Sequence, residues 1–129
     1  MIAIRDWMSQ PIISISKDKS IFETAKRMDE KQIGVLPVMK GDVLEGIVTE
    51  RDVVRKVVAK GLDPHQVVVA EIMSQHVLTV DVDAKLIDVA KMMIDKKFRR
   101  VLVTENAKII GIITARDLVK MLSGATSKK

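Results

Sequence analysis

The fold is decided by a short stretch that occurs twice in the chain: Gly-Ile-Val-Thr-Glu-Arg-Asp at residues 46–52 and Gly-Ile-Ile-Thr-Ala-Arg-Asp at residues 111–117. Sliding the sequence against itself by 65 positions aligns residues 8–57 with 73–122 without a gap, and 15 of the 50 aligned pairs are identical. An ungapped match of this length indicates a repeated supersecondary unit that has to pack against its own copy. The chain is therefore a tandem repeat.

Each copy of the repeat predicts the element order β-α-β-β-α. The two central strands are expected at residues 35–39 and 43–48 in the first copy, and at 100–104 and 109–113 in the second. A unit of about 50 residues buries too little surface to be stable alone. The predicted fold class is therefore α/β (α+β), with two repeats packed sheet to sheet about a pseudo-twofold axis.

The repeat also sets the predicted domain boundaries. They are residues 1–61 for the first repeat, 62–70 for a linker, 71–123 for the second repeat and 124–129 for a flexible basic tail. The linker follows from Gly-Leu-Asp-Pro at residues 61–64, because Gly and Pro end helices and form turns.

The composition excludes several classes of protein. With 47% apolar and 30% charged residues, the chain has the composition of a globular protein and not of a disordered one. No apolar run reaches the roughly 20 residues that cross a bilayer, and residues 1–7 lack a hydrophobic signal region, so a cytoplasmic protein is expected. Without cysteine, disulfides and thiolate sites are impossible. The two histidines, His65 and His76, have no catalytic or metal-ligand spacing, so we expect no enzyme and no metal.

The net charge of +5 raises nucleic-acid binding as an alternative function. Charges of both signs alternate along most of the chain, which is typical of a solvated surface. Basic residues gather only in Lys-Lys-Phe-Arg-Arg at residues 96–100 and in the last two lysines. Nucleic-acid binding needs sustained basic stripes and an affinity that falls steeply with salt, so it is the weaker alternative.

The Thr-x-x-Asp in each repeated stretch has two interpretations. Thr49 with Asp52, and Thr114 with Asp117, match a capping box at the start of a helix after an apolar strand. The same helix start suits a phosphate, and a carboxylate one turn in can accept hydrogen bonds from both hydroxyls of a ribose. Because the motif occupies the same place in both copies, a ligand site becomes a serious hypothesis.

Several independent features together resemble a pair of CBS domains, an arrangement called a Bateman module. These features are the β-α-β-β-α duplication, the Met-Ser at residues 8–9 and 73–74, the Leu-Pro-Val at residues 36–38 and the two Gly-Ile-x-Thr-x-Arg-Asp endings. The resemblance covers about residues 3–123. It implies a non-catalytic regulatory module that binds an adenosine-containing ligand in clefts between the repeats. AMP, ADP or ATP is the expected ligand, with S-adenosylmethionine and NAD as alternatives.

The resemblance also implies which residues contact the ligand. In this family the Asp of the terminal motif holds the ribose hydroxyls and the Thr contacts ribose or phosphate, which here gives Asp52 with Thr49 and Asp117 with Thr114. Arg51 and Arg116 are further candidates, although an arginine at a helix start often points into water. The adenine is expected among Met8, Ile13, Ile33 and Val35 in one cleft, and among Met73, Leu78, Phe98 and Arg100 in the other. Each apolar member of these sets could equally belong to the core.

The two clefts are not expected to be equal. Related modules place a His-Arg pair against the phosphate of the ligand held by the other repeat, and this chain has Arg99-Arg100 in the second repeat but Gly34-Val35 in the first. A nucleotide held by Thr49 and Asp52 is therefore expected to meet two guanidinium groups, which bind phosphate well. The second cleft would be empty or take a ligand of lower charge. A solvated strand entry is the alternative role of the two arginines.

The sequence departs from the family pattern at two points. Residues 101–103 read Val-Leu-Val in place of Leu-Pro-Val, and neither copy has the His of the His-Arg pair. These departures leave the identity of the ligand and the number of occupied sites open. The fold does not depend on them.

The distribution of apolar residues on the helices indicates that they pack against another protein chain. The helix expected at residues 84–96 has its polar positions on one narrow stripe, which leaves a broad apolar arc that needs more than one neighbour. We therefore expect a homodimer through helix faces, although a helix wedged between its own sheet and the adjacent helix would also explain the arc. The final helix of each copy predicts a buried stripe made of Val53, Val54, Val57 and Val58, or of Leu118, Val119 and Leu122.

The expected mechanism is that of a nucleotide or energy sensor. No residues remain for an effector domain, so the signal is expected to pass through dimer geometry to a separate, unknown protein. A ligand-independent dimerisation or scaffold module is the competing function, and it predicts no stabilisation by any adenosine compound.

Overall fold

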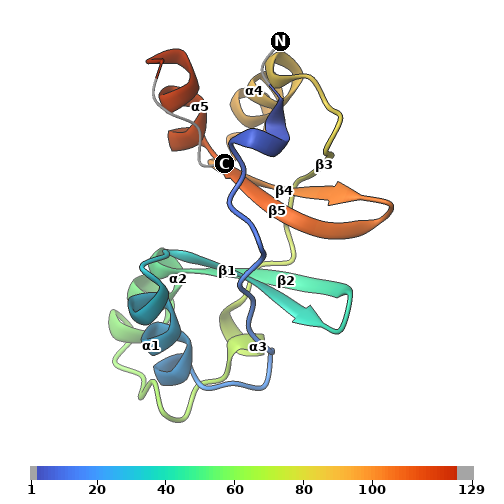
Figure 1. The fold of residues 1–129 in the computed structure, drawn as a ribbon. Helices are drawn as coiled ribbons and strands as arrows, with labels where there is room; N and C mark the ends of the chain where they lie inside the picture. The colour runs from blue at the N-terminus through green and yellow to red at the C-terminus, as the bar shows by residue number, and fades with distance from the viewer. Residues whose placement is uncertain (1–2, 125–129) are drawn as a thin grey trace. The chain divides into compact units, whose positions relative to one another are not determined.

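The computed structural model describes residues 3–124 and forms two sheets with helices (Figure 1). The first copy of the repeat contains α1 (Ile21–Lys31), β1 (Val35–Lys40), β2 (Val43–Thr49), α2 (Glu50–Val53) and a π-helical turn η2 (Val54–Val58). The short helix α3 (Val69–Ile72) follows η2 and lies across the predicted boundary between the linker and the second repeat. The second copy contains β3 (Thr79–Asp81), α4 (Leu86–Lys96), β4 (Arg100–Glu105), β5 (Lys108–Thr114) and α5 (Ala115–Leu122), and a 3-10 turn η1 (Ile4–Asp6) opens the chain.

Both central hairpins lie where the sequence predicts them. β1 pairs with β2 and β4 pairs with β5, both antiparallel, and each strand agrees with its predicted range to within one residue at either end. β3 adds to the second hairpin as a parallel strand beside β4. The mixed α+β fold class is confirmed.

The compact units of the chain are bounded differently from the sequence repeats. One unit is Ile13–Val77, and the other joins Met1–Ile12 to Leu78–Lys129. The N-terminal segment, blue in Figure 1, therefore belongs to the unit of the second repeat. Of the basic tail predicted at residues 124–129, all but Gly124 lies outside the described residues.

Backbone hydrogen bonds explain why the N-terminal segment belongs to the unit of the second repeat. Ser9 pairs with Ile112 on β5 through N···O distances of 2.9 and 3.2 Å, and Ser74 pairs with Ile47 on β2 through two of 2.8 Å. The Met-Ser that opens each copy thus lies against the last strand of the other copy. Each pairing covers a strand edge that would otherwise be open.

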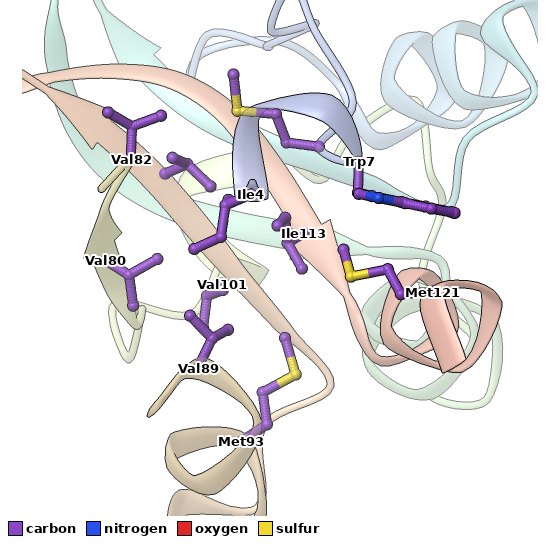
Figure 2. Close-up of a cluster of buried hydrophobic side chains, with 11 residues drawn as sticks. Ile4, Trp7, Val80, Val82, Val89, Met93, Val101, Ile113 and Met121 are labelled. Atoms are coloured by element: carbon purple, nitrogen blue, oxygen red, sulfur yellow. The ribbon is translucent and has the colours of Figure 1, made fainter. Parts of the chain in front are cut away.

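Each unit has its own apolar core. Figure 2 shows the core of the unit that contains the N-terminal segment, where Ile4 and Trp7 lie among side chains of the sheet and of α4 and α5. The other core gathers Ile21 and Met28 of α1 with Leu36, Val38 and Val48 of the hairpin.

The predicted buried stripes of the final helices are wrong in part. Val57 is fully buried, but Val54 and Val58 are exposed. In η2 the Ala59 N–H donates to the Val54 carbonyl at 2.8 Å, and this wider π-turn changes which positions face the core.

In the regular helix α5 the buried apolar residue is Met121, whereas Val119 and Leu122 are exposed. The 65-residue shift aligns Met121 with Lys56, so the buried position in the first copy lies one residue further on, at Val57. None of the helices within residues 3–124 is long and apolar enough to cross a membrane.

Candidate ligand-binding site

The first candidate site is the junction of β2 and α2. Thr49 ends the strand in an extended conformation and is the N-cap of the helix. The Asp52 N–H donates to Thr49 Oγ1 at 3.2 Å, and Asp52 Oδ2 accepts from the Thr49 N–H at 2.9 Å. The Thr49 hydroxyl also donates to Asp52 Oδ2, at 3.0 Å. The capping box predicted from the sequence is confirmed here.

The second copy repeats this geometry at the junction of β5 and α5. The Asp117 N–H donates to Thr114 Oγ1 at 3.2 Å, and Asp117 Oδ2 accepts from the Thr114 N–H at 2.9 Å and from its hydroxyl at 3.1 Å. The two residues differ in burial, because Asp117 is buried whereas Asp52 is half-buried.

A count of acceptors shows what the Thr49–Asp52 pair can still bind. A carboxylate offers about four acceptor positions, and three of those on Asp52 are used by the two Thr49 donors and by Lys56 Nζ, at 3.1 Å from Oδ1. A hydroxyl oxygen has two lone pairs, and Thr49 Oγ1 uses one of them for the Asp52 N–H. One acceptor position on each residue is left, which matches two neighbouring hydroxyl donors.

Two charged residues that sequence reasoning missed lie at this junction. Lys56 donates to the Ile72 carbonyl at 2.9 Å as well as pairing with Asp52. The spacing of four residues between Asp52 and Lys56 was a usable signal, because such pairs meet on a helix surface.

The second missed residue is Glu50, whose side chain lies over Gly34. A Cβ on Gly34 would be 3.0 Å from Glu50 Cδ, and the Glu50 N–H donates to the Gly34 carbonyl at 2.9 Å. No local pattern predicts this contact, since it depends on the absence of a side chain at residue 34. Within residues 3–124, no group of three or more His, Asp or Glu side chains is placed to hold a metal ion.

The structure brings part of the first predicted adenine set together with Thr49. Ile13 and Ile33 pack on the core of the Ile13–Val77 unit, and Val35 opens β1 directly opposite Thr49. Met8 lies in the other unit, where it is buried in the core against Gly111. Met73 takes the corresponding place in the unit of Thr49, against Gly46. The exchange of the Met-Ser segments is the reason.

Arg100 is the first residue of β4 and Arg99 directly precedes it, in the same unit as Thr114. Arg99 is exposed, and its carbonyl accepts from the Ala115 N–H at 2.7 Å. Arg100 is half-buried and is paired in register with Thr114. Their predicted contact with a ligand of Thr49 and Asp52 joins residues of the two units and stays a prediction.

The remaining candidates have simple positions. Arg51 and Arg116 are exposed in the first turns of α2 and α5. Leu78 packs on the core shown in Figure 2, and Phe98 is half-buried, with its N–H donating to the Met93 carbonyl at 2.9 Å.

Comparison with known proteins identifies the family. The sequence pattern of the CBS domain matches residues 4–59 and again residues 69–124. The chain therefore belongs to the CBS domain family and carries two copies of that domain.

Named relatives agree with this assignment. The chain is 38% identical over 122 residues to uncharacterized protein MK0525 of Methanopyrus kandleri, with 93% of this chain and 62% of that relative covered. It is 31% identical over 123 residues to Hypoxic response protein 1 of Mycobacterium tuberculosis, with 95% and 86% covered. Thus the chain spans less than two thirds of the first relative and most of the second.

A solved structure supplies a chemical parallel. The CBS domain pair of protein MJ0100, in complex with 5′-methylthioadenosine and S-adenosyl-L-methionine, superposes with a TM-score of 0.84 at 28% identity. The match covers 96% of this chain and 98% of that one. Both ligands of that protein contain adenosine.

Proposed function

We propose that this protein is a non-catalytic regulatory module that binds an adenine nucleotide and that Thr49 and Asp52 hold its ribose. The observation that carries the proposal is the acceptor capacity left on Thr49 Oγ1 and Asp52 after their capping hydrogen bonds and the Lys56 contact. Two adjacent acceptors at a helix start suit the vicinal hydroxyls of a ribose. The adenosine ligands of the MJ0100 domain pair support the same class of ligand.

The proposal assigns Arg99 and Arg100 to the phosphate on chemical grounds. Guanidinium groups bind phosphate through several hydrogen bonds in one plane, and they stay charged at every physiological pH. AMP is the simplest ligand that presents both a ribose and a phosphate. ADP, ATP, S-adenosylmethionine and NAD are the other ligands to be compared with it.

Calorimetric titration of the full chain with AMP tests the proposal. We expect binding near one site per chain that is lost in Asp52→Ala and kept in Asp29→Ala, a matched removal of an exposed aspartate on α1. Equal affinity in both variants would show that the ribose assignment is wrong. If the wild type binds none of the five ligands, the scaffold function becomes the better account.

We also propose a homodimer through α4 and α5, through which ligand binding would be signalled to a separate protein. These two helices pack beside each other, and each has large apolar side chains that are exposed to solvent. On α4, Ile87 and Ile94 are more than half exposed, and so are Val119 and Leu122 on α5. Exposed apolar side chains that gather on neighbouring helices are typical of a protein interface.

A further inference from the structure

We propose that Lys56 determines the charge of the ligand that the Thr49–Asp52 pair accepts, so that a phosphorylated nucleoside is preferred over an uncharged one. This inference rests on the proposed function and adds a specificity-determining residue to the same site. Lys56 is not part of the Thr-x-x-Asp motif, and its role follows from its contacts.

Lys56 is held in place by two oxygen atoms from different parts of the unit. Its Nζ lies 3.1 Å from Asp52 Oδ1 on the preceding helical turn and donates to the Ile72 carbonyl at the end of α3 at 2.9 Å. A lysine on a flexible four-carbon stem loses rotamer freedom when it is fixed in this way. The second contact offsets part of this cost and favours the position of the ammonium beside the carboxylate, although the Lys56 side chain is 47% exposed.

The ammonium changes the charge of the site without blocking it. It uses one acceptor position of Oδ1, while Oδ2 holds the two Thr49 donors. About one acceptor position of the carboxylate is left for a ribose hydroxyl. Asp52 therefore still accepts a hydroxyl, but its negative charge is balanced by Lys56.

Balance of this charge matters because a phosphate is attached to the same ribose. An uncompensated carboxylate that binds the hydroxyls would repel the phosphate across the width of the ribose. The other charged side chains at the junction do not provide the balance, since Glu50 is negative and lies over Gly34, and Arg51 forms no ion pair with Asp52 in the described part of the chain. Lys56 is the cation in contact with Asp52.

The second copy of the repeat provides an internal comparison. The 65-residue shift places Met121 at the position of Lys56, and this methionine is buried in the core of its unit. The capping boxes have nearly equal hydrogen-bond lengths, so the two copies differ at this position in charge and not in cap geometry. Lys56→Met therefore replaces the lysine with the residue that the chain uses in its other copy.

The test compares AMP with adenosine, which has the same ribose and base but no phosphate. Calorimetric titration of the full chain gives the ratio of the two affinities for the wild type, Lys56→Met, Lys56→Arg and Lys60→Met. Lys60 is an exposed lysine four residues further on and is the matched control. Thermal unfolding of each variant shows that it is folded.

We expect Lys56→Met to lower the AMP-to-adenosine affinity ratio on the order of tenfold, as for one unit charge about 8 Å from a phosphate, across a ribose, in a partly hydrated site. Lys56→Arg, which keeps the charge, and Lys60→Met should both keep the wild-type ratio. A purely structural lysine would weaken both ligands equally, so an unchanged ratio in Lys56→Met overturns the inference. If the wild type binds neither compound, the proposed function fails and this inference fails with it.

Discussion

The carbonyl oxygen of Ser74 lies 2.8 Å from the point that a Cβ on Gly46 would occupy. This close approach allows Ser74 to exchange two backbone hydrogen bonds with Ile47, the next residue on β2. The glycine of the repeated stretch is thus required by the Met-Ser segment of the other copy. At Gly111, a Cβ would likewise collide with the Met8 side chain and with the Ser9 carbonyl.

Gly46→Ala is expected to destabilise the protein by about 1–3 kcal/mol, the usual cost of forcing an extra methyl group into a packed site. The backbone at Ser74 cannot move aside without losing its hydrogen bonds to Ile47. Chemical unfolding measures the change in the free energy of unfolding.

Gly34→Ala is the control for this prediction. Its Cβ would meet the side-chain end of Glu50, which can rotate away, so the free energy of unfolding should change by less than about 1 kcal/mol in either direction. Equal destabilisation by the two alanines would show that the Ser74 contact is not the cause.

The two capping carboxylates are expected to differ in their effect on stability. Asp52→Ala should cost about 1 kcal/mol, a typical value for a partly exposed cap. Asp117→Ala should cost about 2–3 kcal/mol, because Asp117 is almost fully buried and its hydrogen bonds involve a charged group. Thermal unfolding of both variants beside Asp29→Ala checks the order, and a larger loss in Asp52→Ala would contradict it.

Glu23 should titrate abnormally at the start of α1. Hydrogen bonds from the Ser20 backbone N–H and hydroxyl to the Glu23 carboxylate lower its pKa below the ordinary value of 4.5. A carboxyl whose pKa is lowered by folding stabilises the protein above its unfolded pKa, and this contribution is lost as the pH falls from about 4.5 through the folded pKa. NMR titration should show the pKa of Glu23 rising in Ser20→Ala, and an identical midpoint in both proteins would refute the assignment.

The sequence predicts best what depends on residues close in the chain. The capping boxes join residues three positions apart, and the hairpins join neighbouring strands, so the motif and the alternation of apolar residues suffice for both. The exchange of the Met-Ser segments pairs Ser9 with Ile112, which is far away in the sequence. The local pattern of apolar and polar residues does not predict such a distant pairing.

The final helices show a second limit. The period of an α-helix makes Val54 and Val58 equivalent to Val57 as core residues, but the π-turn rotates the chain so that only Val57 is buried among these three. The candidate site likewise combines predictable and unpredictable contacts. The contact between Thr49 and Asp52 joins residues three positions apart and is predicted by the motif. The carbonyl of Ile72 beside Lys56 ends α3, a short helix that the sequence does not predict and that lies across the predicted boundary between the linker and the second repeat.

Substitution of Ile94 tests the proposed homodimer, because this apolar residue of α4 is 75% exposed. An interface that buries Ile94 in both copies would gain about 1.5–3 kcal/mol from each side chain. Ile94→Asp should therefore weaken dimerisation on the order of 100-fold or more. Val43→Asp is the matched control, because Val43 is also an exposed aliphatic residue but lies at the start of β2. Sedimentation velocity over a range of protein concentrations should show a dimer for the wild type and Val43→Asp and a monomer for Ile94→Asp. A wild-type monomer at every concentration, or a dimer that survives Ile94→Asp unchanged, would mean that α4 does not form the interface.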